Sequence, residues 1–203
     1  MSKDSNPKSE RIRMFVALDL PQMVRDEIAS WGEAELVDPA LRRVPAESLH
    51  VTLAFLGNKP LGVVERIAQA MEEVADIPVL MTLGAPVGRP APGRTRFIAL
   101  PVDFSRPIEG LRERLSEILV FERLYEPEKR PFWPHVTVAG VRAEGRGSKR
   151  RPMQVEIPSG PAPTECVGFF NGVRISLYRS ELQPSGAQYV PLAQVQLPGT
   201  GWQ

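Results

Sequence analysis

Leu49-His50-Val51-Thr52-Leu53-Ala54-Phe55-Leu56 contains one of the two histidines in this chain of 203 residues. The second histidine lies 85 positions later, in His135-Val136-Thr137-Val138, and a threonine again follows two residues after it. Threonine occupies only 6 of the 203 positions. Two such matches would therefore arise by chance about once in a thousand. The repeated tetrad indicates that the same pair of reactive side chains, a histidine and a threonine, is used twice.

The spacing within each tetrad places two reactive groups on one side of a strand. In an extended strand, residues i and i+2 point to the same face. His50 and Thr52 therefore share a face, and so do His135 and Thr137, while the apolar residues between them face the core. Each strand is predicted to present an imidazole close to a hydroxyl group.

The duplication extends beyond the tetrads. Residues 15–20 match residues 97–102 at an offset of 82, and both segments have the short apolar pattern of a buried strand. Each is followed by apolar residues at helical spacing. The pattern predicts helices over 21–36, 61–74 and 106–125, tetrad strands over 49–56 and 135–141, and later strands over 79–83, 167–170, 173–177 and 190–197. A β-α-β pattern used twice predicts an α+β fold whose two lobes are related by a pseudo-two-fold axis, with the tetrads face to face.

Composition limits the classes of partner. Lys and Arg number 25 against 24 Asp and Glu, so the chain has no general attraction for nucleic acid and any polyanion site has to be local. The single cysteine, Cys166, excludes an internal disulfide, and we expect it to be a small buried residue. No segment has the apolar length of a membrane span or the pattern of a signal peptide. We expect a cytoplasmic protein with a disordered tail over residues 1–12.

Two histidines facing one cleft suit in-line displacement at phosphorus. One imidazole can act as base on the entering oxygen and the other as acid on the leaving oxygen, and each proton transfer contributes ~10²–10⁴-fold to the rate. Threonine hydroxyls can donate hydrogen bonds to the non-bridging oxygens. The residues leave two alternatives open. One is a pair of structural histidines; the other is a metal site, for which nothing in the sequence places Asp19 in the cleft as a further ligand.

The tetrads and their surroundings resemble the two-histidine phosphoesterase superfamily, and more narrowly the RNA 2',3'-cyclic phosphodiesterases, historically called 2'-5' RNA ligases. The resemblance rests on residues 13–21, 49–57 and 130–138, on Leu-Tyr-x-Ser at 177–180 and on Gly-x-x-Tyr at 186–189. It covers the chain from about residue 13 to residue 197. The implied fold is bilobal and duplicated, with two antiparallel β-sheets facing a central cleft and helices packed on the outside. We expect a single bilobal domain over residues 13–198.

The resemblance also implies an activity and residue roles. It implies hydrolysis of an RNA 2',3'-cyclic phosphate end to a terminal 2'-phosphate, with no metal or other cofactor. His50 is the implied proton donor to the departing O3', and His135 is the implied proton acceptor from water. Thr52 and Thr137 are implied phosphate ligands. The expected partner is RNA with a 2',3'-cyclic phosphate terminus, and we expect a monomer without membrane contact.

One position departs from the family pattern. Members often carry an arginine five residues after the second histidine, and here that position is Gly140. Arg142 lies on the same face two residues further on and can substitute if the strand continues. Arg130, in the approach to His135, is the better candidate for binding substrate phosphate. A solvated surface arginine is the alternative interpretation of Arg130.

Further cationic and aromatic residues are candidates for RNA contact. Residues 142–151 hold five basic residues and one acidic residue, which makes them the strongest local candidate for contact with an RNA backbone. Arg89, Arg94 and Arg96 form a smaller cationic stretch. In the pair Phe132-Trp133, one ring can stack on a terminal base while the other packs in the core.

An RNA 2',3'-cyclic phosphodiesterase is therefore the leading hypothesis for function. Within the same class, the alternatives are a different cyclic phosphate substrate or weak 2'-5' RNA ligation. From another class, the alternative is a non-catalytic module that binds RNA ends. Two intact imidazole–hydroxyl pairs argue against that module, because binding alone does not need titratable groups.

Overall fold

The computed structural model describes residues 11–91, 93–144, 151–159, 163, 168–183 and 186–199. These residues form an α+β fold with three α-helices, two 3-10 turns and twelve strands. The helices are α1 (Gln22–Glu35), α2 (Val64–Val74) and α3 (Arg106–Phe121), and the 3-10 turns cover Ala46–Ser48 and Leu61–Val63. The strands are β1 (Arg11–Asp19), β2 (Leu41–Arg43), β3 (His50–Pro60), β4 (Leu80–Met81), β5 (Val87–Arg89), β6 (Phe97–Pro101), β7 (His135–Val141), β8 (Ala143–Glu144), β9 (Arg151–Pro152), β10 (Phe170–Asn171), β11 (Arg174–Gln183) and β12 (Gly186–Gln196).

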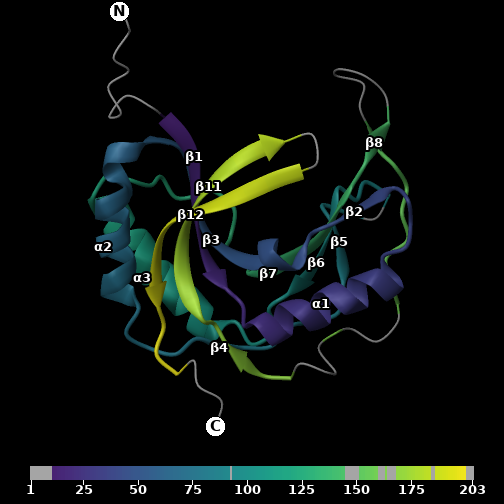
Figure 1. Cartoon of the computed structure of the whole chain (residues 1–203), viewed down its shortest axis with the longest axis horizontal. Helices are drawn as coiled ribbons and strands as arrows, with labels where there is room; N and C mark the ends of the chain where they lie inside the picture. Colours follow the sequence, from purple (N-terminus) through teal and green to yellow (C-terminus); the bar gives the residue numbers. More distant parts are fainter. Residues whose placement is uncertain are drawn as a thin grey trace, which may run out of the picture.

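Two antiparallel groups of strands meet at the tetrads. The order β12-β11-β1-β3 forms one group and β7-β6-β5 the other, with β2 paired to β7 (Figure 1). The expected two sheets are joined into one eight-stranded sheet within the described residues, because β3 pairs with β7 at Val51 and Val136. These two buried valines are the second residues of the two tetrads. Since they are antiparallel and equivalent, a pseudo-two-fold axis passes between them, as the duplication predicted.

The strand register reproduces the duplication residue by residue. In the first half Asp19 lies opposite His50, Ala17 opposite Thr52 and Phe15 opposite Phe55. In the second half the corresponding pairs are Pro101–His135, Ala99–Thr137 and Phe97–Gly140. Both halves also shift register at the same place, between Val16 and Ala17 and between Ile98 and Ala99. The repeat therefore includes an irregularity of the strands as well as their apolar pattern.

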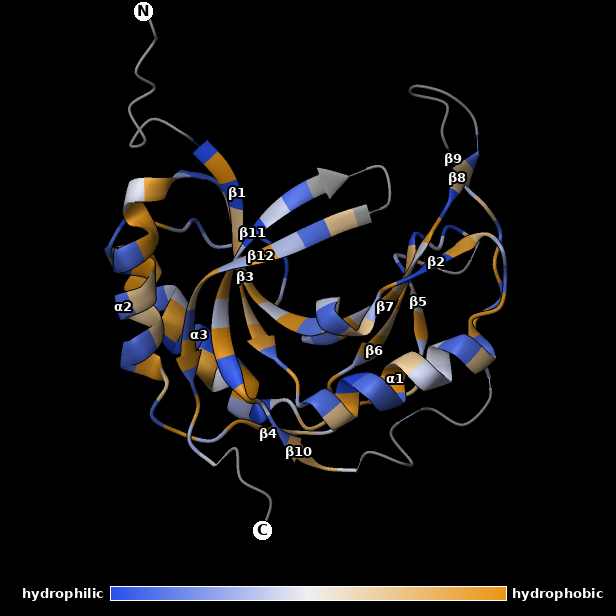
Figure 2. Cartoon of the chain, in the orientation of Figure 1, coloured by the Kyte–Doolittle hydropathy of each residue, from blue (hydrophilic) through white to orange (hydrophobic). Residues whose placement is uncertain are grey.

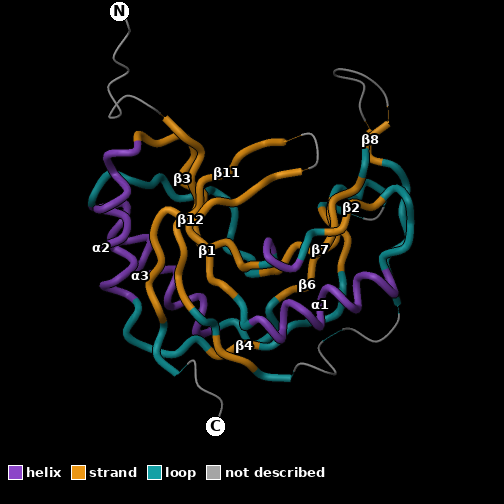
Figure 3. The backbone as a smooth tube through the Cα atoms, in the orientation of Figure 1, coloured by secondary structure: helices purple, strands orange, loops and turns teal. Residues whose placement is uncertain are grey.

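The helices do not stay with the half that precedes them in sequence. α1 follows β1, yet its Ile28 and Gly32 line one small cavity with Val44 and Val138 beside β2 and β7. α3 follows β6, yet it packs against α2, β3 and β4 (Figures 1 and 3). The two β-α-β units therefore exchange helices across the axis, which apolar periodicity cannot predict because it marks the buried face and not the partner.

Each helix buries one apolar face against the sheet. In α3 the fully buried side chains are Ile108, Leu111, Leu115 and Leu119, which recur at helical spacing. Burying each such side chain contributes ~1.5–3 kcal/mol. Hydrophilic residues alternate with hydrophobic ones along α1 and α2, as Figure 2 shows. The helices thus form the predicted outer layer of the fold.

Several predicted boundaries differ from those observed. β1 begins at Arg11, two residues before the expected start of the domain, and Ile12 is already part of the core. The helix expected to reach residue 125 ends at Phe121. Arg123 adopts a φ of 57°, and the backbone N–H groups of Leu124 and Tyr125 then bond back to the carbonyl of Leu119. This turn stops the helix although the apolar pattern continues.

The strand predictions differ mainly in length. The strand expected over 79–83 is reduced to Leu80–Met81 with an isolated bridge at Leu83. The two C-terminal strands are longer than expected, because β11 and β12 pair along nearly their whole length. Of the strand expected over 167–170, only Phe170 lies in a described strand, and the short strands β2, β5, β8 and β9 carry no signal that predicted them. Within the described ranges, every helix is too short or too polar to cross a membrane.

Candidate functional site

A cleft of about 550 Å³ lies where the two halves of the sheet meet. Both histidines and both tetrad threonines line it, so the structure brings four of the five predicted site residues together. The lining residues are Arg13, Met14, Phe15, Val44, Ser48, His50, Thr52, Phe55, Gly57, Phe97, His135, Thr137, Ser180, Ala187 and Tyr189.

Strand pairing positions the four tetrad side chains. Because β3 and β7 run antiparallel through Val51–Val136, His50 lies on the side of Thr137 and His135 on the side of Thr52. Val51–Val136 is the single registered pair between these two strands within the described residues, and all four tetrad side chains line the cleft.

Both imidazoles are held by the same type of hydrogen bond. His50 Nδ1 lies 2.8 Å from the carbonyl oxygen of Ser48, and His135 Nδ1 lies 2.7 Å from that of Trp133. A carbonyl can only accept, so Nδ1 carries the hydrogen in each ring. In the neutral imidazoles Nε2 is then the free base. In both histidines, Nε2 is thus the ring nitrogen that can accept or donate a proton in the cleft.

His50 lies in a more enclosed environment with an acidic neighbour. Its Nε2 is 3.2 Å from Oγ1 of Thr52. The rings of Phe15 and Tyr189 lie 5.1 and 5.3 Å from the imidazole. Burial lowers the pKa of His50, while the Ser48 carbonyl and the charge of Asp19 raise it in part.

Asp19 is buried beside His50 and fully engaged by neighbouring strands. It is only 2% exposed. Its carboxylate accepts hydrogen bonds from Arg174 Nε at 2.7 Å, Ser176 Oγ at 2.8 Å and the Tyr178 hydroxyl at 2.9 Å. Burial and the neighbouring Asp19 raise the pKa of Tyr178 to about 12, so this hydroxyl stays protonated and keeps donating. Asp19 is therefore a negative charge held in place behind His50.

His135 has an aromatic and cationic environment instead. Its ring stacks on Trp133 at a centroid distance of 4.2 Å, and the Arg89 guanidinium also lies 4.2 Å from the centre of the Trp133 ring. Phe97 lies 5.8 Å from the imidazole. Burial lowers the pKa of His135, the Trp133 carbonyl opposes this shift, and the positive charge of Arg89 adds to it.

The pair Phe132-Trp133 does not offer a free stacking surface. Phe132 packs against the core with Arg112 5.2 Å from its ring centre. Trp133 is engaged by His135 and Arg89. The aromatic side chains that do line the cleft are Phe15, Phe55, Phe97 and Tyr189. Phe55, with 54% of its surface exposed, has the most accessible of these rings to offer a base.

The cationic residues are placed differently from the prediction. Arg130 is exposed and is not among the described residues that line the cleft. Arg13 lines the cleft and acts electrostatically on Tyr189. Sequence reasoning assigned Arg13 no role, although it lies two positions before Phe15 on the first duplicated strand. Arg142 follows the last residue of β7 and lines a separate pocket with Gly140.

Two further predictions concern residues whose structure is not described. Cys166 lies outside the described residues, as do residues 145–150 of the basic segment 142–151. Among the residues that are described, no three His, Cys, Asp or Glu side chains gather as a metal site requires. The carboxylate of Asp19 is directed to Arg174, Ser176 and Tyr178.

Comparisons with known proteins found similar sequences along most of the chain. The model of the 2'-5' RNA ligase superfamily matches residues 20–146, more than half of the chain. The RNA 2',3'-cyclic phosphodiesterase of Methanothermobacter thermautotrophicus is 26% identical over 185 residues, which are 90% of this chain and 97% of that protein. The protein of the same name from Thermus thermophilus is 29% identical over 208 residues, covering 93% of this chain and 91% of that one.

Solved structures share the fold. The crystal structure of TT0787 of Thermus thermophilus has a TM-score of 0.69 at 25% identity and covers 94% of this chain and 100% of its own. That of Escherichia coli LigT complexed with 3'-AMP has a TM-score of 0.71 at 24% identity, covering 93% of this chain and 99% of its own. The bilobal arrangement described above is therefore also that of solved proteins.

Proposed function

The chain belongs to the 2'-5' RNA ligase superfamily, and on that premise we propose that it hydrolyses RNA 2',3'-cyclic phosphate ends to terminal 2'-phosphates. The reaction uses His50 as proton donor and His135 as proton acceptor, and it needs no metal ion. The names of curated relatives support the substrate class. The observation that carries the proposal is the antiparallel Val51–Val136 pair, which sets two imidazole–hydroxyl pairs into one cleft.

The geometry supports a single in-line displacement. Nε2 of His135 takes a proton from a water molecule as the water oxygen attacks phosphorus. The bond from phosphorus to O3' breaks on the opposite side, and the proton on Nε2 of His50 passes to the departing O3'. The products are a 2'-phosphate and a free 3'-hydroxyl. The hydroxyls of Thr52 and Thr137 donate hydrogen bonds to the non-bridging oxygens, where negative charge grows in the transition state.

The difference between the two histidine environments supports the assignment of roles. A proton donor has to hold its proton before the reaction, and a nearby negative charge favours the imidazolium. Asp19 lies opposite His50 in the register, while Pro101 occupies the equivalent position opposite His135. Arg89, on the side of His135, disfavours a second positive charge there. Burial lowers the pKa of both histidines, but the charge of Asp19 opposes this shift at His50, whereas the charge of Arg89 adds to it at His135. This difference in neighbouring charge supports His50 as the proton donor and His135 as the acceptor.

The test is incubation of an oligoribonucleotide that ends in a 2',3'-cyclic phosphate, with and without EDTA, followed by identification of the terminal phosphate. We expect equal turnover in both conditions and a product with a 2'-phosphate. Loss of turnover in EDTA would contradict the metal-free mechanism. A 3'-phosphate product would mean that O2' is the leaving group.

The same assay separates the alternatives. A nucleoside cyclic phosphate that is turned over in preference to every RNA end would point to a different physiological substrate. Adding an RNA with a 5'-hydroxyl tests ligation, because that hydroxyl can replace water as the nucleophile and give a 2'-5' linkage. Tight binding of the cyclic end without any turnover would identify a binding module.

A further inference from the structure

We propose that a second, basic pocket beside the cleft binds the phosphodiester backbone of the RNA upstream of its cyclic end. The inference rests on the proposed function and extends it from the terminal phosphate to the chain that carries it. The pocket has a volume of about 420 Å³, and its lining includes Arg42, Arg96, Gly140 and Arg142. Three arginines around one pocket favour a polyanion.

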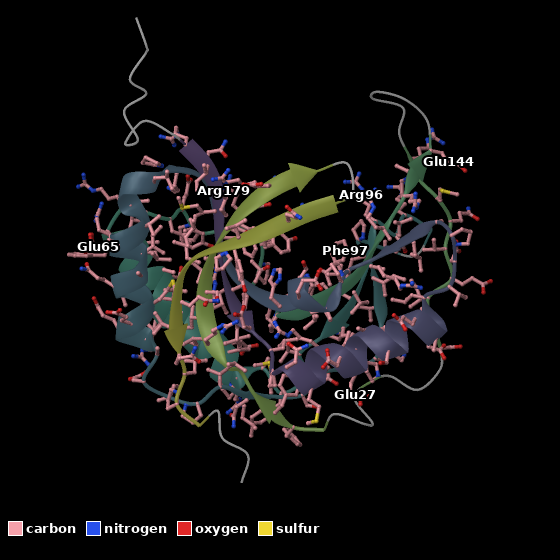
Figure 4. All side chains as sticks on the ribbon, in the orientation of Figure 1. Glu27, Glu65, Arg96, Phe97, Glu144 and Arg179 are labelled. Carbon is pink, nitrogen blue, oxygen red and sulfur yellow. The ribbon has the colours of Figure 1, made fainter. Side chains whose placement is uncertain are left out.

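The pocket continues the strands that form the cleft. Val44 and Phe97 line the cleft, and Arg42 and Arg96 line the pocket. Arg42 lies opposite Gly140 in the β2–β7 register, and Gly140 lies opposite the cleft residue Phe97 in the β6–β7 register. Figure 4 shows Arg96 beside Phe97 on the right-hand half of the molecule, with Arg179 on the opposite half. An RNA strand that leaves the cleft past Phe97 therefore reaches the pocket next.

Gly140 opens this space. In the first half of the sheet the equivalent position is Phe55, opposite Phe15, whereas in the second half Gly140 lies opposite Phe97. A Cβ atom added at Gly140 would meet no atom within 4 Å. On β7 the glycine is five residues beyond His135, a distance of about 16 Å along an extended strand at ~3.3 Å per residue. The pocket is therefore separate from the reacting phosphate and suited to a group further along the substrate.

The arginines of the pocket are available for a ligand. Arg42, Arg96 and Arg142 are all exposed, and among the residues that the structure describes none of them forms an ion pair. Four other arginines of the described residues, Arg66, Arg114, Arg174 and Arg179, do form ion pairs with carboxylates. In a chain of net charge +1, three neighbouring unpaired guanidinium groups form a local positive field.

The test uses the full-length protein and compares its activity on substrates of different length. A nucleoside 2',3'-cyclic phosphate and a pentaribonucleotide with the same cyclic end are assayed with wild type and with Arg42→Gln/Arg142→Gln. Wild type should have the higher kcat/KM for the pentamer. In the variant, kcat/KM for the pentamer should fall by roughly 3- to 10-fold per arginine, while kcat/KM for the nucleoside substrate should not change. The slope of log KM against log salt concentration should fall by about 0.7 for each phosphate group that is no longer neutralised. The charge-matched control is Arg106→Gln/Arg123→Gln, on and just after α3, which should behave as wild type.

A second variant tests the pocket without changing charge. Gly140→Phe places an aromatic ring among the lining residues of the pocket, and it should lower kcat/KM for the pentamer by a larger factor than kcat/KM for the nucleoside substrate. A length preference that is unchanged in both variants, or an equal loss on both substrates, would overturn the inference. If wild type turns over neither substrate, the proposed function has failed instead.

Discussion

The half of the sheet around His50 and the half around His135 share register, a strand irregularity and the histidine–carbonyl hydrogen bond, and two of the positions at which they differ bear directly on the site. Asp19 faces His50 where Pro101 faces His135, and Phe55 stands where the second half has Gly140. The shared features build a cleft with two similar imidazoles. The two differences give those imidazoles opposite electrostatic surroundings and open a pocket on one side only. The duplication thus sets the positions of the two imidazoles, and the positions at which the halves differ set the chemical surroundings of each imidazole.

The largest effect is expected from removing either histidine. His50→Ala and His135→Ala should each lower kcat by ~10²–10⁴-fold, because each removes one of two proton transfers. Neither side chain is part of the apolar core cluster, so the variants should fold as wild type. Single-turnover kinetics and circular dichroism measure the two quantities. If one variant retained nearly full turnover, the two halves would not act as an acid–base pair.

A smaller loss is expected from the threonines. Thr52→Val and Thr137→Val keep the side-chain shape and remove one hydroxyl donor, which should cost roughly 10- to 100-fold in kcat. Thr52→Val should cost more, since Thr52 also lies 3.2 Å from Nε2 of His50. Among the described residues, no hydrogen bond joins Thr137 to His135. Equal kcat values for Thr52→Val and wild type would exclude that hydroxyl from the transition state.

Arg13→Gln and Arg130→Gln should differ from each other in KM by about tenfold or less. Arg13→Gln removes a cation that lines the cleft and should raise KM by ~3- to 10-fold. Arg130→Gln should leave KM within about twofold of wild type, the usual result for an exposed charge outside a site. Steady-state kinetics on the same oligonucleotide measures both. A larger effect at Arg130 would restore its predicted role in phosphate binding.

The smallest change in maximal rate, and the sharpest test of the asymmetry, comes from the charges near the histidines. Asp19→Asn removes a negative charge that raises the pKa of His50, so this pKa should fall further. Arg89→Gln removes a positive charge that lowers the pKa of His135, so that pKa should rise. Since the chain has two histidines, NMR titration can follow both rings, assigned with the alanine variants.

The two substitutions should also move the bell-shaped pH profile of kcat/KM, whose apparent pKa values belong to the coupled pair. Because burial lowers the pKa of both histidines, the maximum should fall on the acid side of neutrality. Asp19→Asn should move the alkaline limb to lower pH, and Arg89→Gln should move the acid limb to higher pH. If Asp19→Asn moved the acid limb instead, and Arg89→Gln moved the alkaline limb, then His135 would retain its proton to higher pH than His50. The roles of the two histidines would then be reversed.

Much of this site follows from local sequence pattern. The tetrad spacing and the strand period of two predict that each histidine shares a face with its threonine, and the offsets of 82 and 85 predict a pseudo-two-fold arrangement. The observed β3, β6 and β7 agree with that prediction. Strand period and duplication are properties of neighbouring residues, so they can be detected without the fold.

Contacts between distant segments had to come from the structure. Asp19 and Arg174 lie 155 positions apart, and only the pairing of β1 with β11 brings them together beside His50. The exchange of α1 and α3 between the halves, and the position of Arg13 in the cleft where Arg130 was expected, have the same origin. Local pattern determines which face of a strand or helix is buried. The packing of the whole chain decides which other face that surface contacts. This packing gives two similar histidines different neighbours and therefore different proposed roles.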